Sequence, residues 1–201
     1  GWATFWHYTL LNHLYDEGKV NDGFMMEFLT SHTNVVAQPG FDSPYYNGIN
    51  PYALGFNMFR DIRRICENPT DEDREWFPDI AGKDWLETLH FAMRDFKDES
   101  FIQQYLSPHL MREFHLFSIY DDEKADHYRV DAIHNDQGYR KLRETLARQY
   151  DLSVREPNIQ VIHVDVEGDR SMTLKHTQQD GKPLSGYTYE VLKHLHTLWG
   201  F

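Results

Sequence analysis

Hydrophobic residues recur with a helical period through most of the first 150 residues of the chain. Residues 2–17 are apolar nearly all round, which predicts a helix that is buried on most sides. A second helix is expected over residues 23–37. A third begins at Asn50-Pro51, an N-cap residue followed by proline at the first helical position, and its apolar arc continues to Cys66.

Shorter helical segments follow the third helix. Asn68-Pro69 ends that helix, and the acidic residues 70–75 predict a short turn or helix. We interpret Glu72, Asp73 and the acidic residues 121–123 as solvated turns. Further helices are expected from Asp84, whose capping box includes Glu87, to Phe96, from Ser107-Pro108, and over residues 138–150.

Alternating apolar and polar residues predict two β-hairpins. Residues 115–120 and 127–133 would form the first. Beyond a candidate boundary at residues 155–158, the second hairpin pairs residues 159–166 with 170–176. The expected connection is a two-residue turn at Gly168-Asp169.

A helix over residues 187–199 completes the pattern, after a turn at Asp180-Gly181 and before a stop at Gly200. The predicted fold is therefore mainly α with a small α+β C-terminal element. A helical core domain spans residues 1–156, and a β-hairpin-and-helix appendage spans residues 157–201.

The composition limits the classes of partner. The net charge of −12 argues against binding to nucleic acid or to an anionic membrane, because both need a positive field. The lone cysteine, Cys66, allows no intrachain disulfide and fits a reducing cytoplasm. The longest apolar runs fall short of the ~20 residues of a membrane helix. We therefore expect a cytoplasmic protein.

Both ends of the chain look incomplete. Gly1 leads directly into a helical pattern, and no capping residue precedes it, so the natural polypeptide is expected to continue upstream. A hairpin with one helix is a thin fold, so a further strand is expected downstream.

Four segments carry a family resemblance: residues 1–8 (GWATFWHY), residues 50–56 (NPYALGF), Ser107-Pro108 with Arg112, and residues 170–176 (RSMTLKH). Across essentially its whole length the chain resembles the stage V sporulation protein R (SpoVR) family. The resemblance implies a role in spore cortex formation or stress physiology. It also implies two candidate partners, a serine-protein kinase and a von Willebrand-type protein, because their genes tend to lie beside those of family members.

The same resemblance raises a zinc hypothesis. In the family pattern a glutamate directly precedes the position of Gly1, and the resulting string is similar to one in some zinc peptidases. No metal ligand is assigned in this chain, since none of its twelve histidines form a His-x-x-x-His pair. Zinc would then be held in the full-length protein by upstream residues. His7, two helical turns from that glutamate, would orient it, or would instead be a core histidine.

Two more side chains are candidate catalytic groups beside His7. Tyr52 begins the third helix and Arg63 lies at the edge of its apolar arc, where a phenol and a guanidinium could stabilise an oxyanion. The alternative is a buried tyrosine and an arginine paired with an acidic neighbour.

The long loop over residues 39–50 supplies candidate ligand-binding residues, Tyr45, Tyr46 and Asn47. It could cover a cleft between the first and third helices, or its aromatic side chains could fill the core.

Two functions remain open. The first is a noncatalytic regulatory or interaction protein, which predicts an exposed apolar patch. The second is a zinc-dependent hydrolase of the peptidase or amidase kind, which requires His7, Tyr52 and Arg63 to line one cleft.

Overall fold

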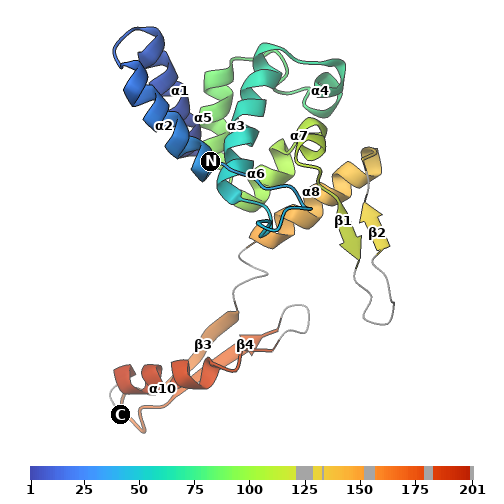
Figure 1. Cartoon of the computed structure of the whole chain (residues 1–201). Helices are drawn as coiled ribbons and strands as arrows, with labels where there is room; N and C mark the ends of the chain where they lie inside the picture. Colours follow the sequence, from blue (N-terminus) through green and yellow to red (C-terminus); the bar gives the residue numbers. More distant parts are fainter. Residues whose placement is uncertain (121–128, 133, 152–156, 179–182, 200–201) are drawn as a thin grey trace. The chain divides into compact units, whose positions relative to one another are not determined.

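Figure 1 shows a computed structural model of the chain, in which residues 1–120, 129–132, 134–151, 157–178 and 183–199 are described. Contacts divide the chain into two compact units, Gly1–Ala147 and Arg148–Phe201. The helices are α1 (Trp2–Asp16), α2 (Asp22–Val35), α3 (Pro51–Glu67), α4 (Asp71–Trp76), α5 (Trp85–Asp95), α6 (Asp98–Tyr105), α7 (Pro108–Glu113), α8 (Asp136–Tyr150) and α10 (Thr188–Trp199). The strands are β1 (Ser118–Tyr120), β2 (Arg129–Ala132), β3 (Asn158–Val164) and β4 (Met172–Thr177). The mainly α fold with a small α+β C-terminal element is confirmed.

Short polar side chains set several helix starts where the sequence predicts them. The Asn50 Oδ1 accepts a 2.9 Å hydrogen bond from the Tyr52 backbone N–H, so Asn50 caps α3. Asp84 caps α5 in the same way through the Glu87 N–H, and Ser107 caps α7. These contacts are local, which is why the sequence reveals them.

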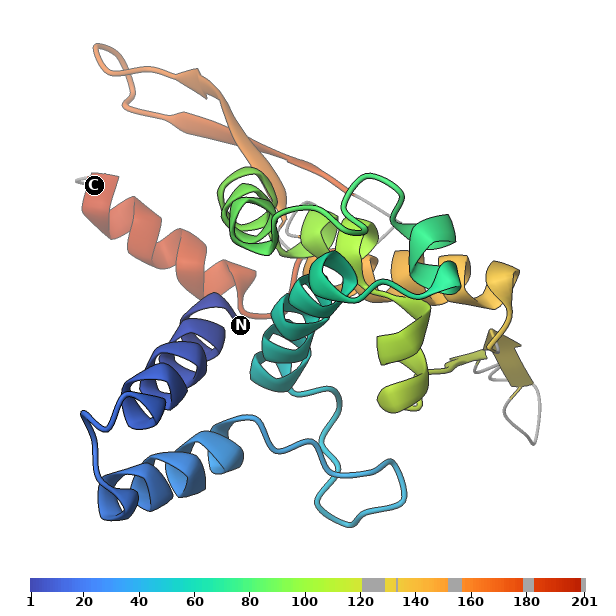
Figure 2. The same ribbon diagram turned by 90° about the horizontal axis from the view of Figure 1, so that it is seen from above.

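Helix α3 is the centre of the first unit and packs against α1, α5 and α7 (Figure 2). Its fully buried Ile62 and Ile65 face the core, and the Phe59 ring lies 5.3 Å from that of Trp2 in α1. The start of α1 approaches α3 closely: a Cβ on Gly55 would lie 2.8 Å from the Gly1 Cα. A side chain at Gly55 would therefore force the two helices apart.

The first helix is less buried than its sequence predicts. Phe5 is the buried residue of α1, while Leu10 is 53% exposed and Leu11 is half-buried. Helix α1 packs on α2 and α3, and these leave part of its apolar surface uncovered.

The acidic residues after α3 are not the solvated turns that the sequence suggests. They form α4, and Asp73 is only 3% exposed. Its carboxylate accepts hydrogen bonds of 2.6 and 2.8 Å from Arg64, and Glu72 binds Arg112 at 2.6 Å. Asp73 can be buried because its carboxylate meets Arg64 from another helix, whereas Glu72 is part-exposed beside Arg112. Residues 121–123 lie outside the described residues.

The sequence pattern does not predict helix α6, because it places no element between the helix that ends at Phe96 and the helix that begins at Ser107. Its buried residues are Ile102 and Tyr105, a pair too short to show a helical period.

The first hairpin pairs β1 with β2, with Ser118 opposite Ala132 and Ile119 opposite Val130. Residues 121–128 and 133 of the predicted hairpin lie outside the described residues. So do the predicted turn at Asp180-Gly181, the stop at Gly200, and residues 155–156 of the predicted boundary.

The turn of the second hairpin is longer than the two residues predicted. Val164 pairs with Met172, and the Asp165 N–H donates to the Ser171 carbonyl at 2.9 Å, so residues 166–170 form the loop. The Asp165 carboxylate accepts hydrogen bonds from the N–H groups of Gly168, Glu167 and Asp169. This ring of hydrogen bonds favours the wider loop over a two-residue turn.

In the second unit, helix α10 faces strand β4 across an apolar space. The alternation in β4 turns Met172 and Leu174 inward. Leu192 and Leu195 of α10 line the same apolar space of about 490 Å³. The Trp199 Nε1 donates to the Arg170 carbonyl at 2.7 Å, which ties the end of the helix to the hairpin loop.

Candidate functional site

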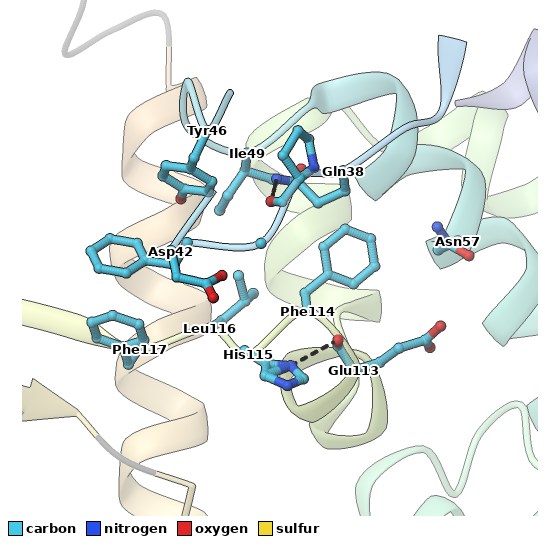
Figure 3. Close-up of a pocket in the computed structure, with 13 residues that line it drawn as sticks. Gln38, Asp42, Tyr46, Ile49, Asn57, Glu113, Phe114, His115, Leu116 and Phe117 are labelled. Atoms are coloured by element: carbon cyan, nitrogen blue, oxygen red, sulfur yellow. Dashed lines mark hydrogen bonds between the residues drawn. The ribbon is translucent and has the colours of Figure 1, made fainter. Parts of the chain in front are cut away.

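The predicted aromatic loop lines the candidate site, a pocket of about 820 Å³ in the first unit (Figure 3). One wall is the loop itself. The other walls come from α3 and from residues 113–117, at the junction of α7 and β1. The lining residues are Gln38, Pro39, Gly40, Phe41, Asp42, Tyr46, Ile49, Asn57, Glu113, Phe114, His115, Leu116 and Phe117.

Two side-chain amides close the neck of the loop. The Gln38 Oε1 accepts a 2.7 Å hydrogen bond from the Asn50 N–H, and its Nε2 donates to the carbonyls of Pro39 and Gly48. The Asn50 Nδ2 donates to the carbonyls of Val35 and Ala37 at 2.8 and 3.0 Å. These bonds hold together chain segments 13 to 15 residues apart. The loop is thus a closed, structured element.

Two consecutive turns shape the tip of the loop. The Ser43 N–H donates to the Gly40 carbonyl, and the Tyr46 N–H donates to the Ser43 carbonyl. Tyr46 consequently faces the pocket, whereas Tyr45 is 83% exposed.

The opposite wall depends on how α7 ends. His115 adopts a left-handed conformation, with φ of 52°, and its N–H donates to the Arg112 carbonyl. The Leu116 N–H then donates to the Met111 carbonyl at 2.8 Å, which satisfies a helix-terminal acceptor. This reversal turns residues 115–117 toward the loop (Figure 3).

The pocket combines aromatic rings with carboxylates. The Phe41 ring lies 5.4 Å from that of Tyr46 and 5.2 Å from that of Phe117, which joins the two walls. The Asp42 carboxylate points from the loop toward the wall that Phe114 and His115 form (Figure 3). Glu113 is the second carboxylate, and no lysine or arginine is among the lining residues. Such a surface is suited to binding, through apolar contact and negative charge.

The described ranges contain no group of three or more His, Cys, Asp or Glu side chains that could hold a metal ion. The zinc ligands that the sequence analysis places upstream of Gly1 stay a prediction.

The three candidate catalytic residues contact different partners. His7 is exposed and places its ring 4.9 Å from that of Phe28 in α2. Tyr52 is 58% exposed, contrary to the buried alternative. Arg63 pairs with Glu67 at 2.9 Å and lies 4.5 Å from the Trp85 ring, as its structural alternative predicts.

Tyr52 and Arg63 share a face of α3, but eleven residues of helix separate them by ~16 Å along the axis. No hydrogen bond joins His7, Tyr52 or Arg63 to another of the three within the part of the chain that the structure describes. Their catalytic role stays a prediction.

Of the three predicted ligand-binding residues, Tyr46 lines the pocket, while Tyr45 and Asn47 are exposed. The sequence predicts that the loop covers a cleft between the first and third helices. Asn57 of α3 does line the pocket beside the loop, but the remaining wall is residues 113–117, and no lining residue comes from α1. Sequence reasoning missed Phe41 and Asp42, although both lie in the loop it selected. It also missed Glu113 to Phe117, because nothing in the sequence links them to a loop some 70 residues earlier.

Two family models together match nearly the whole chain. The model described as "SpoVR like protein" matches residues 1–155, and the "SpoVR-like C-terminal domain" matches residues 157–201. The chain belongs to the SpoVR family. It is also 64% identical, over all 201 residues, to "Uncharacterized protein YcgB" of Escherichia coli (strain K12). No solved structure matches it.

The SpoVR chain spans 39% of the length of that relative. The two family models meet at residues 155–157, whereas contacts separate the two units at Ala147 and Arg148. The domain boundary that the sequence predicts after residue 156 stays a prediction. No helix of the described part is long and apolar enough to cross a membrane.

Proposed function

We propose that this chain is a binding module of a cytoplasmic SpoVR protein, with a regulatory or interaction role in sporulation, including spore cortex formation, or in stress physiology. The pocket between residues 38–50 and 113–117 would receive a segment of a partner protein. The observation that carries this proposal is the pocket itself, with its closed loop and aromatic lining. The partners proposed are the serine-protein kinase and the von Willebrand-type protein expected from the family resemblance.

The exposure of the loop supports a role in binding. Phe41 is 62% exposed and Tyr45 is 83% exposed, although large aromatic side chains contribute most when they are buried. Hydrogen bonds at the neck of the loop fix its ends, and the Phe41 ring contacts those of Tyr46 and Phe117. A preformed aromatic surface loses little conformational freedom on binding, and aromatic residues are enriched where proteins bind each other.

The zinc-dependent peptidase or amidase remains the alternative proposal. It requires metal ligands from outside this chain, with His7, Tyr52 and Arg63 acting together. The contacts of Arg63 with Glu67 and Trp85 give that arrangement no support.

The affinity of the chain for each proposed partner tests the binding function. We expect the purified kinase, the von Willebrand-type protein or both to bind the 201-residue chain in isothermal titration calorimetry. The Phe41→Ala variant should weaken binding at least about tenfold, since truncation of an aromatic anchor costs 1–2 kcal/mol or more.

Met26→Ala is the matched control, because Met26 is 71% exposed and lies on α2, outside the pocket lining. Equal loss in both variants would place the contact elsewhere. Binding of neither protein would remove both proposed partners.

A further inference from the structure

The pocket leaves negative charge without a counterion. No hydrogen bond or ion pair engages the Asp42 carboxylate within the described residues. The Glu113 carboxylate lies 3.8 Å from the His109 Nε2. Asp73 and Glu72 of the same unit are paired with Arg64 and Arg112. The Asp42 carboxylate is therefore an acceptor in the pocket that the described part of the fold does not use.

The aromatic rings beside Asp42 are also without a cation. Elsewhere in the first unit, rings and guanidinium groups are stacked: Arg63 lies 4.5 Å from the Trp85 ring, and Arg140 lies 4.8 Å from the Trp76 ring. No such contact reaches Phe41, Tyr46 or Phe117 among the described residues. A carboxylate next to open aromatic faces is a favourable site for an organic cation.

We propose that this pocket binds the guanidinium or ammonium group of an arginine or lysine side chain on an extended segment of the partner protein. The cationic group would lie against Asp42 and the rings of Phe41, Tyr46 and Phe117. This inference rests on the proposed binding function and specifies the chemistry of the partner.

Size and lining favour a peptide over a small free cation. The pocket measures about 820 Å³, and a single basic side chain fills a fraction of that volume. Pro39, Ile49, Phe114 and Leu116 add apolar surface to the pocket, and this surface suits the residues that flank the basic side chain. The net charge of −12 adds a long-range attraction for a basic segment.

The Asp42 carboxylate folds back over Gly40, a residue that has no side chain. An added Cβ on Gly40 would lie 2.8 Å from the Asp42 Oδ1. A Gly40→Ala substitution should displace the carboxylate and weaken cation binding without removing the charge.

The test is an NMR titration of the 201-residue chain, followed through the backbone amide shifts of residues 41–46 and 113–117. The ligands are four acetylated and amidated pentapeptides, Ala-Leu-Xaa-Leu-Ala, where Xaa is arginine, lysine, norleucine or glutamate, and argininamide alone. Peptide concentrations up to about 20 mM reveal affinities as weak as a few mM.

The proposal predicts that the arginine and lysine peptides bind about tenfold or more tightly than the norleucine peptide, and that the glutamate peptide binds least. Asp42→Asn should remove most of this preference and leave the norleucine peptide unaffected. Glu27→Gln, at an exposed carboxylate of α2 outside the lining residues, is the matched control and should change nothing.

Equal affinity for the arginine and norleucine peptides would overturn the cation site but leave the pocket as a binding site. Equal affinity for argininamide and the arginine peptide would overturn the peptide as the source of the cation. Failure of every ligand to shift these amides, in a chain that still binds its partner protein through Phe41, would overturn the inference alone. Failure of both assays would overturn the proposed function as well.

Discussion

Individual polar residues at helix ends and in the core hold the first unit together. Asn50 both caps α3 and closes the loop that lines the pocket. His32 lies in the aromatic core between α1, α2 and α3, where the rings of Tyr8 and Phe56 are 5.0 and 4.8 Å away. Asn50 therefore couples the stability of the fold to the shape of the site, whereas His32 affects stability alone.

Substitution of Asn50 separates its two roles. Asn50→Asp keeps an oxygen that accepts from the Tyr52 N–H but loses both amide donors to Val35 and Ala37. We expect it to lower the free energy of unfolding by about 1–2 kcal/mol, at roughly 1 kcal/mol for each hydrogen bond. Asn50→Ala also removes the cap and should cost about 1 kcal/mol more. Urea unfolding measures both, and equal losses would contradict the separate roles.

His32 should make the stability of the chain sensitive to pH. Its side chain is 8% exposed and its Nε2 has no hydrogen-bond partner. Burial, with the nearby His7 and Arg60, lowers the pKa of His32 below its ordinary value of 6.5. The unfolded chain therefore takes up a proton first, so stability is fully present above pH 6.5 and falls as the pH drops below it.

We expect the midpoint temperature of thermal unfolding to decrease as the pH is lowered from about one unit above 6.5 to about one unit below it. The His32→Phe substitution should make this decrease smaller. His13→Gln is the control, since His13 is exposed. An unchanged pH dependence in His32→Phe would show that protonation of His32 is not coupled to folding.

At the scale of helices, one buried ion pair joins α3 to α4. Arg64 binds both Asp61 and Asp73, and Asp73 also accepts hydrogen bonds from the N–H and hydroxyl of Thr70. Burial would raise the pKa of Asp73, but the hydrogen bonds from Arg64 and Thr70 outweigh it and hold that pKa at about 2. The ordinary value is 3.8, so the fold is about 2 kcal/mol more stable with Asp73 ionised, at neutral pH, than with Asp73 protonated.

Asp73→Asn should therefore lower the free energy of unfolding by about 2–4 kcal/mol at pH 7, because it leaves Arg64 without its strongest partner. The depressed pKa means that this contribution is present above pH 3.8 and is lost as the pH falls toward 2, so the difference from the parent chain should shrink there. Asp71→Asn, on the exposed side of α4, is the control and should have little effect. Equal losses in the two variants would contradict the account.

Features that depend on neighbouring residues could be predicted from the sequence, and features that depend on distant contacts could not. Asn50-Pro51 and Ser107-Pro108 mark the starts of α3 and α7 because a cap acts within three residues. The burial of Asp73 depends on Arg64, which belongs to another helix. The pocket wall at residues 113–117 depends on packing against a loop about 70 residues earlier, so only the loop could be foreseen.

At the scale of the whole molecule, an acidic SpoVR chain carries an open aromatic pocket with unpaired negative charge inside its larger unit. The charge favours basic partners over nucleic acid, and the pocket gives that preference a defined place. The chain spans 39% of the length of its Escherichia coli relative. The activity of the whole protein is therefore a proposal. We propose that the loop and the α7–β1 junction together form the binding site.

Hydrogen–deuterium exchange of the 201-residue chain, with and without the serine-protein kinase or the von Willebrand-type protein, would locate the binding site. We expect slower exchange in two segments at once, residues 38–50 and 113–117, and unchanged exchange in α10. Protection confined to α10, or to α1 and α2, would show instead that the partner binds another surface.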